Sequence, residues 1–237
     1  MQSRNARGAA GVVGPAAYAA WRATVLGSIT ESIEQRLILE LAGEVRGLRA
    51  LDAGSGDGAL ACLIAQRGAE VVGIDVDPAM VAVARVRAAK AGLNVTLLEG
   101  RLERLPFGDE TFDLVVAVTV LCFAPDGGAA VRELARVLKP GGRLVIGELG
   151  RWSSWAARRR ICGWLGSQTW AAAHFRTGGD LKALVAQTGL YVGAIQGAVY
   201  YPPVGVLARV LAPTDGWLGR LTTFGAAFIA IVGIKRV

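Results

Sequence analysis

Short apolar runs rich in β-branched residues alternate with longer stretches of helical periodicity through the middle of the chain. The candidate strands are residues 48–51, 70–74, 95–98, 112–118 and 143–146. Between them, apolar positions such as Leu60 and Ile64, and later Met80 and Val83, recur at the spacing of one helix face. This alternation predicts βαβ units, and therefore an α/β fold built on a mostly parallel sheet.

The segments on either side of this alternating core have different patterns. Residues 32–45 predict one amphipathic helix that leads into the first strand. After the core, residues 180–187 predict a helix, residues 191–201 a strand, and the apolar run from Phe224 a final strand. Two closing strands joined by a long connection predict an antiparallel pair at one edge of the sheet.

Length and composition fit one globular domain. The 237 residues are 53% hydrophobic and 19% charged, which excludes a disordered chain. No apolar run reaches the about 20 residues that a transmembrane helix needs. Glycines and Pro15 interrupt the apolar stretch near the N-terminus, so a signal peptide is poorly supported. We expect a cytoplasmic protein with a loose N-terminal tail.

Charge and cysteine content narrow the range of partners. The net charge is +7, but the basic residues are spread along the chain and form one cluster, at residues 158–160. Because no basic stripe with interleaved aromatic residues is present, nucleic acid is not the favoured partner. Cys62, Cys122 and Cys162 lie in apolar sequence without a CxxC pair, which argues against disulfides and a metal site and favours three buried thiols.

A glycine-rich segment follows the first predicted strand and opens a predicted helix. It contains Gly54, Ser55 and Gly56, and such a loop lets the backbone turn sharply and approach a ligand closely. The next strand ends in Asp75, roughly 20 residues after Gly56, where a carboxylate can hold the two hydroxyls of a ribose. These features predict a site for a cofactor that contains adenosine.

Asp52 helps to distinguish between the two main cofactors of this kind. A carboxylate beside the loop repels a pyrophosphate but can orient the ammonium of an amino-acid moiety. The loop also has the pattern Gly-x-Gly-x-Gly rather than Gly-x-Gly-x-x-Gly. Both features favour S-adenosylmethionine. An NAD(P)-dependent oxidoreductase and a catalytically silent cofactor-binding or scaffold protein remain as alternatives.

Several stretches together resemble the class I S-adenosylmethionine-dependent methyltransferases, in the small-molecule, type 11-like group. They are residues 51–58, 71–80, 99–107, 112–117 and 136–146. The resemblance implies a Rossmann-like seven-stranded, mostly parallel sheet with helices on both faces and an antiparallel last strand. It implies methyl transfer to a small acceptor that is apolar or carries a thiol, hydroxyl or amine. The expected parts of the single domain are an N-terminal lid (1–46), a cofactor-binding core (47–149), and a substrate cap with a closing hairpin (150–237).

The resemblance also assigns residues to the cofactor. By position these are Gly54, Ser55, Gly56 and Val118 for the methionine part, Asp75 for the ribose, and Val76, Met80, Arg101 and Leu102 around the adenine. Arg101 departs from the family, which usually has Asp there, and a guanidinium cannot accept a hydrogen bond from the adenine amino group. We therefore expect that adenine is recognised through backbone groups, or that the affinity is modest.

Aromatic residues near the N-terminus and the C-terminal part suggest the substrate side. Tyr18 and Trp21 resemble a Tyr-x-x-Trp lid segment that closes over the cofactor, although they can equally be an aromatic pair that packs the first helix. His174 is the single candidate for a base that titrates near neutrality, and a structural role near a helix start is the alternative. Tyr200 is a further candidate to line the substrate pocket, or is an ordinary strand residue.

Residues 150–170 are unusually rich in tryptophan and arginine. Trp152 lies in this segment and is a candidate for the substrate pocket. We expect the segment to cap an apolar substrate. Contact with an anionic membrane surface, plain packing and a dimer face are the alternatives. The expected partner is a small-molecule methyl acceptor, and the protein is expected to be a monomer or a homodimer.

Overall fold

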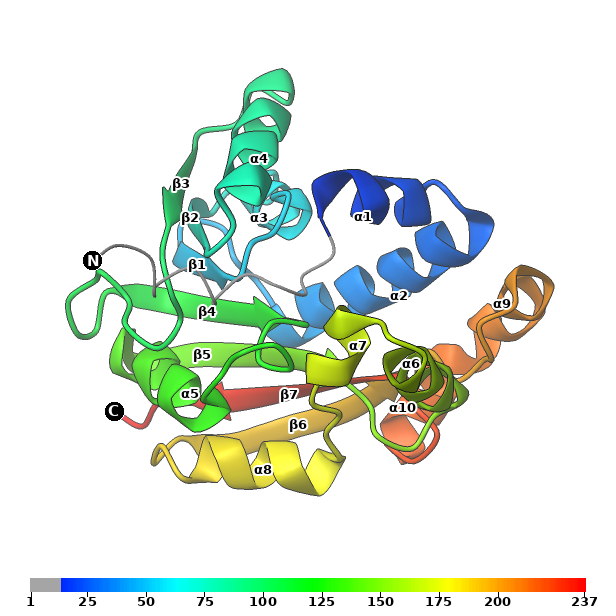
Figure 1. The fold of residues 1–237 in the computed structure, drawn as a ribbon. Helices are drawn as coiled ribbons and strands as arrows, with labels where there is room; N and C mark the ends of the chain where they lie inside the picture. Colours follow the sequence, from blue (N-terminus) through cyan, green and yellow to red (C-terminus); the bar gives the residue numbers. More distant parts are fainter. Residues whose placement is uncertain (1–13) are drawn as a thin grey trace, which may run out of the picture.

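The computed structural model describes residues 14–237, and the predicted N-terminal tail falls in residues 1–13, outside this range. A seven-stranded sheet with strand order β3-β2-β1-β4-β5-β7-β6 forms the centre of the molecule (Figure 1). The strands are β1 (Arg49–Ala53), β2 (Glu70–Asp75), β3 (Val95–Glu99), β4 (Phe112–Val118), β5 (Leu138–Leu149), β6 (Tyr191–Ala198) and β7 (Phe228–Ile234). The first five strands are parallel, whereas β7 is antiparallel to both β5 and β6. The predicted α/β fold with a reversed last strand is confirmed.

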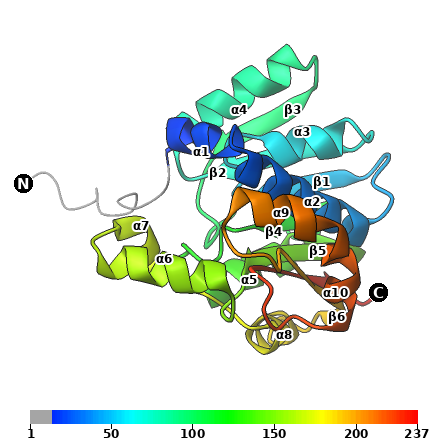
Figure 2. The same ribbon diagram turned by 90° about the vertical axis from the view of Figure 1, so that its right-hand side faces the viewer.

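Helices cover both faces of this sheet (Figures 1 and 2). They are α1 (Pro15–Arg22), α2 (Val25–Ala42), α3 (Ala59–Ala65), α4 (Pro78–Lys90), α5 (Gly127–Arg136), α6 (Ser154–Trp164), α7 (Gln168–Ala172), α8 (Gly178–Ala186), α9 (Gly205–Leu211) and α10 (Asp215–Leu221). On one face Leu134 of α5 and Leu181 of α8 pack on the strands, and on the other face Ile38 of α2 and Ile64 of α3 do so. Burying β-branched strand residues on both faces is what the continuous apolar runs of a parallel sheet require.

Two elements differ from the sequence-based boundaries for local reasons. The helix predicted at residues 32–45 begins at Val25, because the Thr24 side chain caps it by accepting a hydrogen bond from the Gly27 backbone at 3.0 Å. It ends before Gly43, whose φ of 69° suits a glycine. The last strand begins at Phe228 rather than Phe224, which is 73% exposed.

The strand β5 starts earlier than predicted. The segment Lys139-Pro140-Gly141-Gly142, which precedes the predicted strand, belongs to an irregular first part of β5. Its backbone bonds to the other end of the chain, because Gly141 donates to the Lys235 carbonyl at 2.8 Å and Lys235 donates to the Gly142 carbonyl at 3.1 Å.

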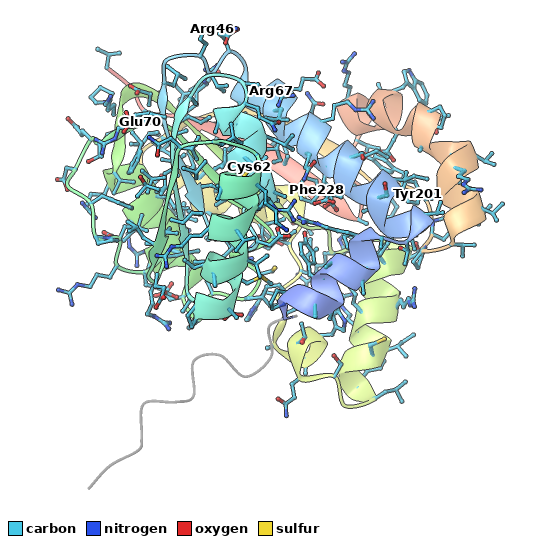
Figure 3. The ribbon with its side chains drawn as sticks, turned by 90° about the horizontal axis from the view of Figure 1, so that it is seen from above. Arg46, Cys62, Arg67, Glu70, Tyr201 and Phe228 are labelled. Carbon is cyan, nitrogen blue, oxygen red and sulfur yellow. The ribbon has the colours of Figure 1, made fainter. Side chains whose placement is uncertain are left out.

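The connection after β6 packs against α2. Tyr201 is fully buried, and its hydroxyl lies 3.0 Å from the Thr30 hydroxyl (Figure 3). Cys62 of α3 is also buried, in a cluster with Val81 and Leu97. Within residues 14–237 we find no helix with the length and apolar character to cross a bilayer.

Topology places three important loops at one edge of the sheet. The strands β1, β2 and β4 run parallel, so their carboxyl ends meet at the same edge. The glycine-rich loop follows β1, Asp75 ends β2, and Thr119 follows β4. Ligands of open α/β sheets bind at this edge.

Candidate active site

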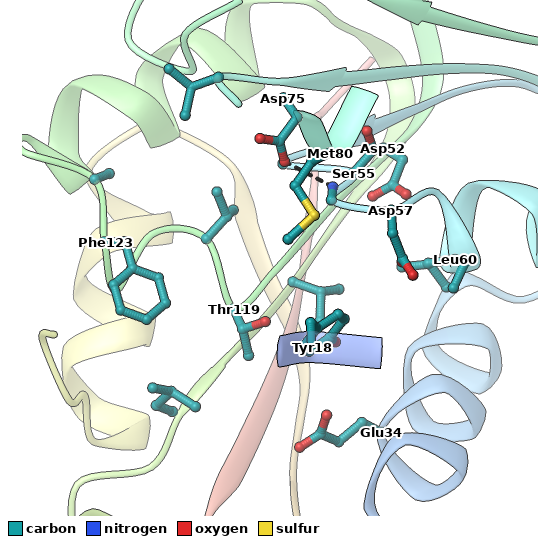
Figure 4. Close-up of a pocket in the computed structure, with 18 of the residues that line it drawn as sticks. Tyr18, Glu34, Asp52, Ser55, Asp57, Leu60, Asp75, Met80, Thr119 and Phe123 are labelled. Carbon is teal, nitrogen blue, oxygen red and sulfur yellow. Dashed lines mark hydrogen bonds between the residues drawn. The ribbon is translucent and has the colours of Figure 1, made fainter. Parts of the chain in front are cut away.

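A cavity of about 570 Å³ opens at this edge of the sheet (Figure 4). All eleven residues assigned to the cofactor from the sequence line it: Tyr18, Asp52, Gly54, Ser55, Gly56, Asp75, Val76, Met80, Arg101, Leu102 and Val118. We call the part formed by the ends of β1, β2 and β4 the strand side. The part formed by Glu34, Phe123, Trp155, Arg159, Cys162 and Trp170 is called the aromatic side.

The glycine-rich loop leaves room at the floor of the cavity. Gly54 and Gly56 have positive φ values of 80° and 52°. A Cβ atom at Gly54 would collide with the Val120 side chain, whereas one at Gly56 would meet no protein atom within 4 Å. The open space at Gly56 therefore forms a cradle in which a ligand can approach the backbone closely.

Asp75 is held rigidly at the end of β2. Its Oδ2 accepts a hydrogen bond from the Gly56 backbone at 2.8 Å, and its Oδ1 accepts one from the Asp77 backbone at 2.9 Å. Burial raises the pKa of Asp75, and these backbone bonds oppose that shift. Each carboxylate oxygen can accept a further bond. The fixed carboxylate is therefore able to accept both hydroxyls of a ribose.

Asp52 and Ser55 carry buried polar atoms without partners. Asp52 is 2% exposed, and within the described chain neither its Oδ2 nor the Ser55 hydroxyl has a hydrogen-bond partner. Burial, and next the charge of Asp75, raise the pKa of Asp52 to about 7. Unpaired buried polar atoms are rare and costly in native proteins. A ligand that brings an ammonium group would satisfy them, which fits the amino-acid part of S-adenosylmethionine.

The N-terminal helix covers the strand side. The rings of Tyr18 and Trp21 stack with centroids 5.8 Å apart and an interplanar angle of 18°, and both residues line the cavity. Burial raises the pKa of Tyr18 to about 12. The two rings therefore stack on each other and also line the cavity, and closure of this segment over a cofactor stays a prediction.

The end of the cavity near Arg101 holds an acceptor that sequence reasoning missed. Arg101 lines the cavity, and its Nε lies 3.4 Å from Oε2 of Glu103. Glu103 also lines the cavity. Its carboxylate can accept a hydrogen bond where the Arg101 guanidinium cannot. The departure at Arg101 therefore does not leave this end without an acceptor.

The aromatic side is built by the tryptophan-rich segment. Trp155 of α6 is fixed by a hydrogen bond from its Nε1 to the Tyr201 carbonyl at 2.9 Å. The ring of Trp170 in α7 lies 6.3 Å from the ring of Phe123. Cys162 also lines this side and is half-buried, in contrast to the buried position expected for it. The segment thus forms part of the cavity wall, and its role as a cap over a substrate stays a prediction.

Glu34 provides a carboxyl group on the aromatic side (Figure 4). It projects from α2, and burial raises its pKa to about 7, while the charge of Arg159 opposes the shift. A carboxyl group with such a pKa can accept and release a proton near neutral pH. Sequence reasoning missed it.

Three residues predicted for the substrate pocket lie elsewhere. His174 is exposed, and its backbone N–H donates to the Cys122 carbonyl at 2.9 Å, so it has a structural position and does not reach the cavity. Trp152 is 56% exposed, and Arg151 lies over its ring. The Tyr200 hydroxyl donates to the Thr222 carbonyl, away from the cavity.

Glu148 anchors the loop that follows β4. It is fully buried, accepts a hydrogen bond from the Leu121 backbone at 2.9 Å, and lies 3.3 Å from the Arg176 guanidinium. Burial raises its pKa to about 7. Because Glu148 does not line the cavity, its role is to hold the loop that carries Thr119 and Phe123.

Comparison with known proteins agrees with this geometry. A family model described as a methyltransferase domain matches residues 51–146. An uncharacterized protein of Mycobacterium tuberculosis is 37% identical over 110 residues, which are 46% of this chain and 40% of that protein. The chain thus spans about two fifths of that relative's length.

A second relative is matched over more of its length. The ubiquinone biosynthesis O-methyltransferase of Azorhizobium caulinodans is 31% identical over 176 residues, or 72% of this chain and 69% of that protein. Among solved structures, a possible histamine N-methyltransferase from Thermotoga maritima superposes with a TM-score of 0.69 at 24% identity, over 92% of this chain and 95% of that one. That likeness concerns the fold. Together, the match to the Azorhizobium enzyme, the family model and the cavity show that the chain belongs to the class I S-adenosylmethionine-dependent methyltransferases.

Proposed function

We propose that this protein transfers a methyl group from S-adenosylmethionine to a small, largely apolar acceptor bound on the aromatic side. The observation that carries the proposal is the continuity of one cavity, from the carboxylates of Asp52 and Asp75 to the rings of Trp155 and Trp170. A site of this shape can hold a cofactor and an acceptor in contact, which is the main requirement of a methyl transfer.

The charges on the strand side suit this cofactor. When bound, S-adenosylmethionine supplies an electrophilic methyl group on a positively charged sulfur. Asp75 would hold the ribose, and Asp52 and Ser55 would receive the amino-acid part. The cavity suits NAD(P) poorly, because the Asp52 carboxylate would repel the pyrophosphate of that cofactor.

The aromatic side would orient the acceptor and exclude water. Bound on the strand side, S-adenosylmethionine would supply the methyl group to the acceptor atom, and its sulfur would keep the electron pair of the broken carbon–sulfur bond. For a hydroxyl acceptor, as the name of the Azorhizobium relative suggests, the proton can pass to the Glu34 carboxylate and then to water.

A direct test is the formation of S-adenosylhomocysteine when the protein is incubated with S-adenosylmethionine and a panel of phenols, thiols and apolar amines. Acceptor-dependent formation supports the proposal. If the protein binds the cofactor but forms no product with any member of the panel, a silent cofactor-binding protein becomes the better description. A matched reaction with Asp75→Ala identifies background chemistry.

A further inference from the structure

Arg159 lies on the aromatic side between two indole rings. Its guanidinium carbon is 5.2 Å from the ring centroid of Trp155 and 4.8 Å from that of Trp170. A cation over the face of an aromatic ring is held there by the electrostatics of the ring. The N–H donors of a guanidinium lie in its plane as a rigid fork that matches a carboxylate.

The donors of Arg159 are not used by other protein groups. Across residues 14–237, the Arg159 guanidinium forms neither a hydrogen bond nor an ion pair, although the residue is half-buried and lines the cavity. Arg22, which also lines the cavity, is by contrast paired with Glu31 and Asp57. The guanidinium of Arg159 therefore faces the cavity with its donors free to bind a ligand.

The surrounding charges leave room for an anion at this position. Glu34 is the carboxylate whose charge acts on the pKa of Arg159, yet no hydrogen bond joins the two side chains. The pKa of Glu34 is raised to about 7, so this group is partly protonated at neutral pH. Arg158 lines the cavity as well. The two negative charges of Glu31 and Asp57 are balanced by Arg22, which pairs with both, and by Arg87, which pairs with Asp57. The aromatic side is therefore positively charged overall.

We propose that Arg159 binds a carboxylate of the methyl acceptor, and that the acceptor is an aromatic acid. The guanidinium fork matches a carboxylate in two parallel hydrogen bonds, and the rings of Phe123, Trp155 and Trp170 provide surfaces on which an aromatic ring can pack. This assignment of the substrate class rests on the proposed function, since it concerns the acceptor half of the same cavity.

The test compares benzoate with its uncharged isostere benzamide by calorimetric titration of the whole protein saturated with S-adenosylhomocysteine. Benzoate should bind at least about tenfold more tightly than benzamide, because the benzoate carboxylate makes charge-assisted bonds. In Arg159→Met this preference should disappear. Arg160→Met is the matched control, because Arg160 lies over the Phe175 ring and does not line the cavity.

Two further measurements keep the outcomes separate. Arg159→Lys, which keeps the charge but loses the fork, should show an intermediate preference, and it serves as the test variant if thermal unfolding shows that Arg159→Met is misfolded. Equal binding of the two probes to the natural protein, no binding of either, or a preference that survives in Arg159→Met or is undiminished in Arg159→Lys would overturn the proposal. Failure of S-adenosylhomocysteine to bind would instead count against the proposed function, and the benzoate comparison would then be made without it.

Discussion

Arg22 in α1 pairs with Asp57 in the loop that leads into α3, and this contact ties the N-terminal helix to the glycine-rich loop. The same guanidinium lies 2.5 Å from Glu31 in α2 and 4.5 Å from the centre of the Tyr18 ring. Arg87 of α4 approaches Asp57 from the other side, at 2.6 Å. The charges therefore hold the covering helix in place over the strand side of the cavity.

Removing this link should weaken cofactor binding. Arg22→Met retains most of the volume but loses both ion pairs, so α1 spends less time closed over the site. We expect the affinity for S-adenosylhomocysteine to fall by about 1 kcal/mol, or roughly fivefold, in calorimetric titrations. Arg87→Met, which removes the other partner of Asp57, should change the affinity less. Equal affinities of Arg22→Met and the natural protein would show that α1 does not cover the cofactor.

The ribose site has a well-matched control on the neighbouring strand. Asp75→Ala should weaken binding of S-adenosylhomocysteine by about 1.5–3 kcal/mol for each charge-assisted bond that is lost. Glu99 pairs with Asp75 in register at the end of β3, but it is exposed and lies outside the cavity. Glu99→Ala should therefore bind normally. An unchanged affinity of Asp75→Ala would mean that Asp75 does not hold the ribose.

The pKa of Asp52 predicts a proton exchange upon binding. With a pKa of about 7, Asp52 is mostly protonated at pH 6 in the ligand-free protein, and an ammonium group beside it favours the ionised form. Binding of S-adenosylhomocysteine should thus release close to one proton at pH 6 and almost none at pH 8.5. Calorimetry in buffers of different ionisation enthalpy measures this number. The affinity should fall as the pH drops below 7.

The Asn variant separates Asp52 from Asp75, whose pKa is raised too. Asp52→Asn should lose most of the proton release at pH 6, and an undiminished release would contradict the assignment. The same shift affects the ligand-free fold. Because the folded pKa of Asp52 lies above its ordinary value of 3.8, the contribution of Asp52 to stability falls as the pH rises from about 4 to 7.

The acid–base role should belong to Glu34 and not to His174. His174→Ala removes an exposed side chain outside the cavity, so both stability and turnover should stay near the natural values. Glu34→Gln should lower kcat about 100-fold or more with a hydroxyl acceptor, as expected when a general base is lost, while the affinity for S-adenosylhomocysteine changes little. A large loss in His174→Ala, or none in Glu34→Gln, would reverse this assignment.

The cofactor half was predictable because its chemistry follows the chain locally. The glycine-rich loop, Asp52 and Asp75 lie at strand ends, and parallel strands bring their carboxyl ends together without further information. Periodicity also located the strands, except where a local cap or an irregular segment shifted a boundary, as at Thr24 and at the start of β5.

The other half depends on directions that a single sequence does not encode. The sequence singled out the tryptophan-rich segment, but it did not show that Trp155 and Trp170 line the cavity while Trp152 is exposed. Glu34 lies on a helix whose inward face is set by packing on the sheet. His174 attracted attention as the single histidine, and residue type alone gave no sign of its exposure.

The most direct test of the central claim is calorimetric titration of the natural protein with S-adenosylhomocysteine, with NAD titrated in parallel. The structure predicts a dissociation constant on the order of micromolar for S-adenosylhomocysteine and no binding of NAD. The reason is that the unpaired oxygens of Asp52 and Ser55, beside the open space at Gly56, can bind an amino-acid group, whereas Asp52 would repel a pyrophosphate. Binding of NAD, or of neither ligand, would contradict the account of this cavity as a methyltransferase site.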